Sequence, residues 1–193
     1  MRRWLIPGLI VLLAGCGSSP PTQFYTLDPV APQTAARAAV SMPVQVVAVH
    51  IPADLDRQEM VRERAPHQLE VSDKNRWGGA LDTMIQRVLT QDLARRLPPD
   101  DVVLPEEPAP PHHAAIVVDI LQFDRDSSGN VIFDGSWSLT DASGDKPLLN
   151  RHVRLNAPSS SQSYGDQAAA MSRVLGELAD GIAGGLGAAH AVR

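Results

Sequence analysis

The chain has 193 residues, a formal net charge of −5, 44% hydrophobic residues and one cysteine. This length and apolar content suit one domain with a core of its own. The acidic balance, without any basic run, argues against a nucleic-acid-binding protein and against electrostatic attachment to anionic lipid. A single cysteine excludes a disulfide framework and a cluster of thiolate metal ligands.

The first fifteen residues have the layout of a secretory signal. Arg2 and Arg3 form a short basic head, and residues 4–13 are mostly apolar. This run is too short for a transmembrane helix, which needs about 20 such residues. We therefore predict that residues 1–15 are a cleaved lipoprotein signal peptide.

The only cysteine, Cys16, ends the sequence Leu-Ala-Gly-Cys directly after that run. This ending looks like a bacterial lipobox, in which cleavage before the cysteine precedes acylation. A buried cysteine is the alternative reading, but neither the signal-like run nor the Gly-Ser-Ser-Pro-Pro stretch after it suits a core residue. We predict cleavage between Gly15 and Cys16, and an anchor of acyl chains, palmitate among them, on Cys16. Gly17, where an Asp would favour the inner membrane of enteric bacteria, favours the outer membrane.

Residues 16–23 are expected to be the acylated cysteine and a short tether, because Ser and Pro keep this stretch extended. A tether of this kind spans at most about 20–35 Å. The folded domain, residues 24–193, is therefore expected to sit close to its membrane.

In the first half of the domain, the sequence predicts four strands and a helix. The strands cover about residues 24–27, 43–52, 60–64 and 68–72, and the nearly continuous apolar stretch of the second predicts burial on both faces. Apolar residues spaced three or four apart predict a helix over residues 76–97, which Pro98 and Pro99 end.

The second half predicts a short strand at 102–104, three long β-segments and a C-terminal helix. The segments 114–126, 130–142 and 147–158 are joined by the turn sequences SSGN and SGDK. The helix covers about residues 167–189, and four glycines predict fraying of its last turns. The fold class is therefore α/β: a single domain with a mixed β-sheet and two long helices.

No catalytic, metal or cofactor site can be assigned from the sequence. His112 and His113 are adjacent in a Pro-rich stretch, and neighbours on an extended chain point opposite ways. The segment DRDSSGN opens like a calcium loop, but Gly135 stands where an EF-hand needs Glu, so a hairpin turn is the preferred interpretation. Nucleophile-elbow and phosphate-loop motifs are absent.

Five stretches in order resemble the PqiC (YmbA) family of auxiliary lipoproteins of MCE-type ABC transport systems. They are FYTLDP, VVAVHIPADLDRQEMVRE, NRWGGALDTMIQRVLTQDLARRLP, ILQFDRDSSGNVIFDGSWSLTD and AAAMSRVLGELADGIAGGL. The family landmarks correspond to Arg76-Trp77, Phe123-Asp124 and Trp137. Gly78 and Gly79 depart from the pattern, and His67 stands where relatives carry Asn.

The resemblance implies a fold like the N-terminal domain of TolB and a non-catalytic role without cofactors. It implies an outer-membrane lipoprotein, on the periplasmic face, that docks onto a periplasm-spanning MCE-domain (PqiB-like) membrane protein during lipid transport. Several copies are expected to form a homo-oligomeric ring around that partner. The alternative is an anchored regulator or scaffold of another envelope machine, such as a cell-wall synthase, because a fold alone does not determine function. The aromatic landmarks Trp77 and Trp137 are expected to pack in the core.

Overall fold

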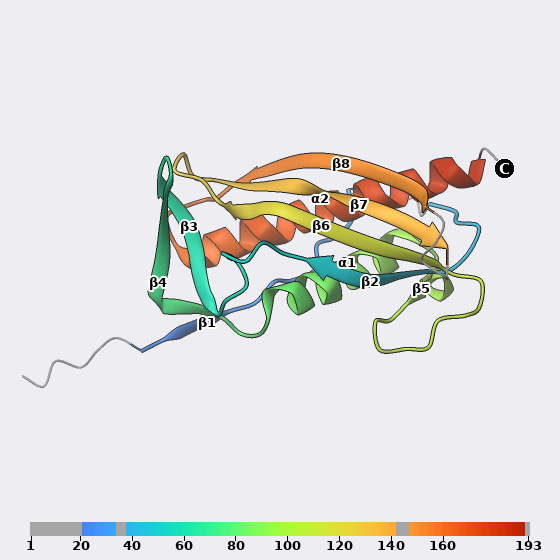
Figure 1. Cartoon of the computed structure of the whole chain (residues 1–193), viewed down its shortest axis with the longest axis horizontal. Helices are drawn as coiled ribbons and strands as arrows, with labels where there is room; N and C mark the ends of the chain where they lie inside the picture. Colours follow the sequence, from blue (N-terminus) through green and yellow to red (C-terminus); the bar gives the residue numbers. More distant parts are fainter. Residues whose placement is uncertain (1–20, 34–37, 142–146, 192–193) are drawn as a thin grey trace, which may run out of the picture.

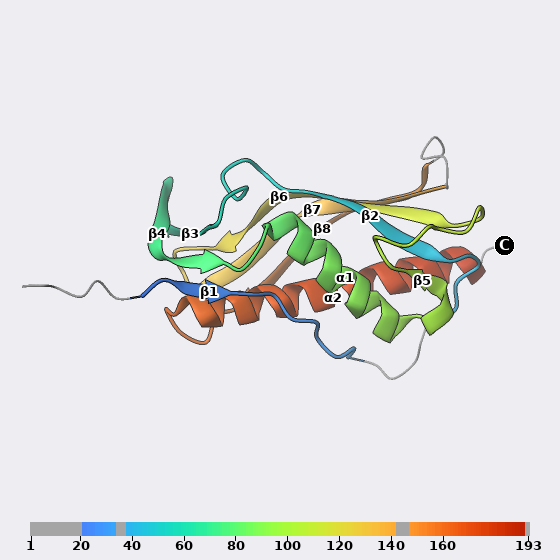
Figure 2. The same cartoon turned by 90° about the horizontal axis from the view of Figure 1, so that it is seen from below.

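An eight-stranded mixed sheet carries two helices on one of its faces (Figure 1, Figure 2). The computed structural model describes residues 21–33, 38–141 and 147–191. Its elements, in chain order, are β1 (Gln23–Tyr25), β2 (Val44–His50), β3 (Glu59–Ala65), β4 (Gln68–Trp77), α1 (Leu81–Arg96), the 3-10 turn η1 (Pro99–Asp101), β5 (Val102–Val103), β6 (Ala114–Arg125), β7 (Asn130–Asp141), β8 (Pro147–Pro158) and α2 (Tyr164–Ala191).

The sheet is organised around β6. Along one side β6 pairs with β7, which pairs with β8, and both pairings are antiparallel. On the other side, the first half of β6 pairs with β2 in parallel, and its last residue, Arg125, pairs with β3. The sheet therefore divides on this side: β2 and β5 lie at one end of the molecule, and β3, β4 and β1 lie at the other (Figure 1).

The core lies between the long β6–β7–β8 meander and the helices. On β7 the alternating residues Val131, Phe133, Trp137 and Leu139 are all buried, as the alternation of the sequence predicts. On α2 the predicted apolar stripe from Met171 to Leu186 is buried as well. The α/β fold with a mixed sheet and two long helices is thus confirmed.

The first helix begins later than the sequence predicts, at Leu81 rather than at residue 76. Arg76 and Trp77 instead extend β4, because they pair with Phe24 and Tyr25 of β1 and Trp77 is buried. Gly78 and the two residues after it then form the link to the helix, and the Gly78 N–H donates to the Tyr25 carbonyl over 2.8 Å. The prediction of a helix from residue 76 was therefore wrong for its first turn.

The second helix is longer than predicted and continues through its glycines to Ala191. Two of these glycines lie close to neighbouring side chains, and the fraying of the last turns stays a prediction. A Cβ on Gly185 would lie 2.8 Å from the Trp137 ring, and one on Gly187 would lie 3.4 Å from Ala38.

The second strand, β2, is buried on one face only. The prediction of burial on both faces was wrong: Val47 and His50 are exposed, because the helices cover only one face of the sheet.

Three features predicted from the sequence are not described by the structure. The predicted signal peptide, Cys16 and the turn SGDK lie outside the described residues. Among the described residues, no helix combines the length and apolar character that a membrane span requires.

Candidate functional site

The family landmarks of the sequence are structural in this fold. Trp77 and Trp137 are buried, as predicted. Phe123 packs edge-on against Phe133 with ring centroids 5.5 Å apart. Asp124 is buried beside it and accepts a hydrogen bond from Gln122 Nε2 over 2.8 Å. These buried residues stabilise the sheet and do not form a functional surface.

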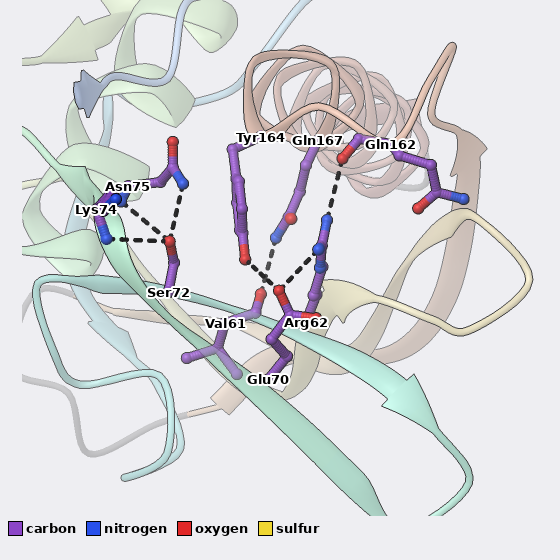
Figure 3. A network of polar contacts seen from close by, with 9 residues as sticks. All are labelled: Val61, Arg62, Glu70, Ser72, Lys74, Asn75, Gln162, Tyr164 and Gln167. Carbon is purple, nitrogen blue, oxygen red and sulfur yellow. Dashed lines mark hydrogen bonds and ion pairs between the residues drawn. The ribbon is translucent and has the colours of Figure 1, made fainter. Parts of the chain in front are cut away.

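At the N-terminal end of α2, a polar network ties the helix to the β3–β4 hairpin (Figure 3). Glu70 Oε1 accepts from Arg62 Nη2 over 2.7 Å and from the Tyr164 hydroxyl over 3.1 Å. Arg62 also donates to the Gln162 carbonyl, and its guanidinium lies 4.6 Å from the Tyr164 ring centre. The Arg62 guanidinium holds the pKa of the Glu70 carboxyl below its usual value. This end of α2 is therefore fixed by directional contacts.

The same end carries a side-chain N-cap. Ser163 stands directly before Tyr164, and its hydroxyl accepts from the Asp166 N–H over 3.1 Å. The Asp166 carboxylate in turn accepts from the hydroxyls of Ser163 and Ser161, which lower the pKa of Asp166. Ser-x-x-Asp is a variant of the capping box, a signal that the sequence contained and the predicted helix start at residue 167 missed.

A buried ion network joins the two helices to the chain segment that follows β1. Asp92 Oδ1 accepts from the Val30 N–H over 2.8 Å, and Arg96 donates to Asp180 Oδ1 over 2.7 Å and to the Val30 carbonyl. The side chains of Asp92 and Arg96 are 0% and 3% exposed. Burial raises the pKa of the Asp92 carboxyl to about 6, although the Val30 N–H and Arg96 act in the opposite direction.

At the C-terminal end of α2, by contrast, the layers leave a cavity of about 410 Å³. Its walls come from residues before and within β2, from the start of β8 and from the last turns of α2. They include Val40, Met42, Leu148, Leu149 and Leu186. A second hollow of about 330 Å³ adjoins it along α2 and shares Arg151, Gly185 and Ala188 with it.

Arg151 is the one Arg, Lys, Asp or Glu among the described residues that line this pair of hollows, and His152, which pairs with Asp134, also lines the second. Alternation along β8 places it on the face that carries Leu149, Val153 and Leu155, which all pack against the core. Within the described parts of the chain, its guanidinium makes neither an ion pair nor a hydrogen bond. The sequence PLLNRHVRLNAP contained this signal, an arginine at an inward position of a strand, and our interpretation missed it.

The other sequence-predicted candidates do not form a site. Gly15 and Cys16 lie outside the described residues. His113 Nδ1 lies 2.7 Å from the Pro110 carbonyl oxygen, and the segment DRDSSGN forms the β6–β7 turn, with Gly129 at φ +100°. His50 and His152 pair with Asp119 and Asp134 on the exposed face of the sheet. In the part of the chain that the structure describes, no three His, Cys, Asp or Glu side chains converge as metal ligands.

The fold defines the class of protein: a small α/β domain in which two helices cover one face of a mixed sheet. Residues 25–183 match the family described as the ABC-type transport auxiliary lipoprotein component. The chain belongs to this family, and its resemblance to the PqiC family is confirmed.

Curated relatives and solved structures agree with this assignment. The chain is 24% identical to the intermembrane transport lipoprotein PqiC of Escherichia coli (strain K12), over 95% of this chain and 96% of the relative. The PqiC protein of Shigella flexneri matches equally. A crystal structure of an uncharacterized protein shares the fold with a TM-score of 0.71 at 20% identity, covering 85% of this chain and 97% of that one. A protein from Xanthomonas campestris does so with a TM-score of 0.66 at 15% identity, covering 87% and 96%.

Proposed function

We propose that this protein is the outer-membrane lipoprotein of an MCE-type intermembrane lipid transport system. In this role it is anchored through acylated Cys16 at the periplasmic face and docks, without catalysis, onto a periplasm-spanning MCE-domain protein. One observation carries the proposal: the auxiliary lipoprotein family matches residues 25–183, which is nearly the whole folded domain. Relatives that match over almost their full length are named as intermembrane transport lipoproteins.

The position of β1 supports a short distance between the domain and its anchor. Gln23 already pairs with Asn75 of β4, so the folded domain begins seven residues after Cys16. Seven extended residues span at most about 25 Å. A domain held so close to one membrane cannot reach the other, and the partner therefore has to supply the bridge across the periplasm.

We also propose that several copies assemble as a ring around the end of the partner. A ring would place the same face of every copy toward a common axis, as closed cyclic symmetry requires. Native mass spectrometry of the complex tests this point: several copies per partner assembly are expected, and a single copy would contradict the ring while leaving the docking role intact.

The docking role is tested with the full acylated chain. The protein is extracted from its own membranes in mild detergent after chemical cross-linking, and stoichiometric partners are identified by mass spectrometry. Recovery of an MCE-domain membrane protein is expected. A Cys16→Ala variant with its signal peptide intact should lose both membrane attachment and most of the recovered partner.

Two results would overturn the proposal. Recovery of a cell-wall synthase in place of an MCE-domain protein would favour the regulator or scaffold alternative. Recovery of the MCE-domain protein at the same level from the Cys16→Ala variant would show that docking does not depend on the anchor.

A further inference from the structure

We propose that the cavity at the C-terminal end of α2 binds one acyl chain of an anionic lipid, and that Arg151 meets the lipid's head group. The physiological meaning of this site, a lipid in transit, rests on the proposed transport function. The binding itself rests on the shape, the lining and the charge of the cavity.

The size and lining of the cavity fit an aliphatic chain. Its volume of about 410 Å³ lies within the range of roughly 300–1,000 Å³ that small-molecule sites occupy. Val40, Met42, Leu148, Leu149 and Leu186 supply aliphatic side chains from three separate parts of the sequence. Such walls favour an apolar guest that leaves water. The described residues that line this cavity include no aromatic ring, and Trp137 lines the second hollow beside it.

The charge of the cavity selects the head group. Arg151 is exposed, unpaired within the described residues, and lines both hollows. Neither hollow has an Asp or Glu among its described lining residues. A lone guanidinium beside an apolar cavity complements an amphiphile whose polar end is a carboxylate or a phosphate.

The second hollow extends the site along α2. A Cβ placed on Gly181 or Gly184 would meet nothing within 4 Å, so side chains are missing where the molecule has room for them. Glycine inside a helix is unfavourable relative to alanine. Gly181 and Gly184 are exposed and line the second hollow, so this stretch of α2 presents no side chains there and leaves room for a longer guest.

The site lies far from the protein's own anchor. The N-terminal end of α2 adjoins β1, where a Cβ on Gly165 would lie 3.6 Å from the Tyr25 ring. From Gly165 to Gly185 the helix rises about 30 Å. The C-terminal end of α2, whose last turns line the cavity, thus lies at the end of the domain opposite β1, the first strand after Cys16 (Figure 2). The guest that we propose is a lipid other than the protein's own anchor.

The test uses the full acylated chain in nanodiscs of phosphatidylcholine and a palmitic acid probe that carries a diazirine and an alkyne. After irradiation, labelled peptides are mapped by mass spectrometry. We expect saturable labelling within residues 38–44, 147–153 and 181–188, with displacement by unlabelled palmitate. Labelling at the opposite end of the domain, around β1, serves as the background, because it comes only from probe dissolved in the bilayer.

Matched variants separate the head-group contact from the cavity. Arg151→Gln should weaken labelling about tenfold, the loss expected for one charge-assisted hydrogen bond. Arg154→Gln removes an exposed arginine from the other face of β8 and should leave the labelling unchanged.

A second pair of variants tests the cavity itself. Ala188→Phe places a ring at the cavity and should block labelling by the probe. Ala169→Phe, at an exposed position near the start of α2, should not block it. Circular dichroism confirms that each variant is folded.

Several results would overturn the proposal. Label that does not saturate, or that avoids the cavity peptides, would exclude the site. Equal labelling of Arg151→Gln and Arg154→Gln would exclude the anionic head group. Labelling that appears only after a protein partner is stripped away would show that a protein segment is the occupant. The two proposals fail separately. If the cavity is labelled but cross-linking recovers no MCE-domain protein, the lipid site stands and the transport function is refuted. If cross-linking recovers the MCE-domain protein but the cavity is not labelled, the transport function stands and the lipid site is refuted.

Discussion

At its N-terminal end α2 is held by a side-chain cap, by the hydrogen bond from Tyr164 to Glu70 and by a cation–π contact, whereas at its C-terminal end the described residues leave a cavity of about 410 Å³. Hydrogen bonds and cation–π contacts depend on direction, so they fix the elements that they join in a single arrangement. Apolar walls with few polar ties allow small shifts that admit a guest. The end next to β1 is therefore held in a fixed position, and the far end has the cavity at which we propose that a lipid binds.

The largest effect is expected between the two ends, in the buried ion network that joins α1, the middle of α2 and the segment after β1. Asp92→Asn keeps an oxygen for the Val30 N–H but removes a titrating group whose pKa is about 6 in the folded protein and 3.8 ordinarily. Because the folded state holds this proton more tightly, Asp92 contributes stability below pH 3.8 that is lost as the pH rises through 6. The free energy of unfolding of the wild type, relative to the variant, should fall by about 3 kcal/mol across that window.

Urea unfolding at several pH values between 3.5 and 7.5 measures this difference. Asp100→Asn, which removes an exposed aspartate, controls for the loss of one negative charge. Parallel pH profiles for the wild type and Asp92→Asn would contradict the role assigned to the buried carboxyl.

Two neighbouring glycines provide the second test, at the far end. Gly185→Ala should destabilise the protein by about 1–2 kcal/mol, because its Cβ would lie 2.8 Å from the buried Trp137 ring. Gly184→Ala meets open space and should stabilise the helix by about 1 kcal/mol. Thermal or urea unfolding followed by circular dichroism measures both. Shifts of the same sign would mean that the packing of this end differs from the one described.

The helix cap at the near end is the third test. Ser163→Ala removes the hydroxyl that accepts from the Asp166 N–H, and the free energy of unfolding should fall by about 1 kcal/mol. Ser127→Ala, in the exposed β6–β7 turn, is the matched control and should have a smaller effect. If both substitutions were equal in effect, the cap would not stabilise the start of α2.

Periodicity predicted the meander and both helices, because the buried positions of β7 and α2 repeat with the period of their own secondary structure. Periodicity failed at the ends of elements, where the pairing partner of a residue determines whether it belongs to a strand or to a helix. Trp77 fits the helical spacing, yet it pairs with Tyr25, more than fifty residues earlier in the chain. No local pattern contains that contact.

The candidate site was predictable only in part. Cys16 follows from a local motif, and the inward position of Arg151 follows from strand alternation. The cavity does not, because Val40, Leu149 and Leu186 meet only in the folded chain. Its volume depends on how closely α2 approaches the sheet, and this approach is closest at Gly185, where a Cβ would lie 2.8 Å from Trp137 and 3.5 Å from Leu149.

The smallest effect is expected at the β3–β4 turn, whose strands carry the Arg62–Glu70 pair of the near end. His67 has φ +65°, a left-handed conformation that glycine adopts without steric cost. His67→Gly should raise the free energy of unfolding by about 0.5 kcal/mol, since relief of strain slightly exceeds the added freedom of the unfolded chain. His67→Val should lower it, because a branched Cβ disfavours this region most. Urea unfolding distinguishes the two, and a valine variant as stable as the glycine variant would mean that the folded protein does not require a left-handed conformation at residue 67.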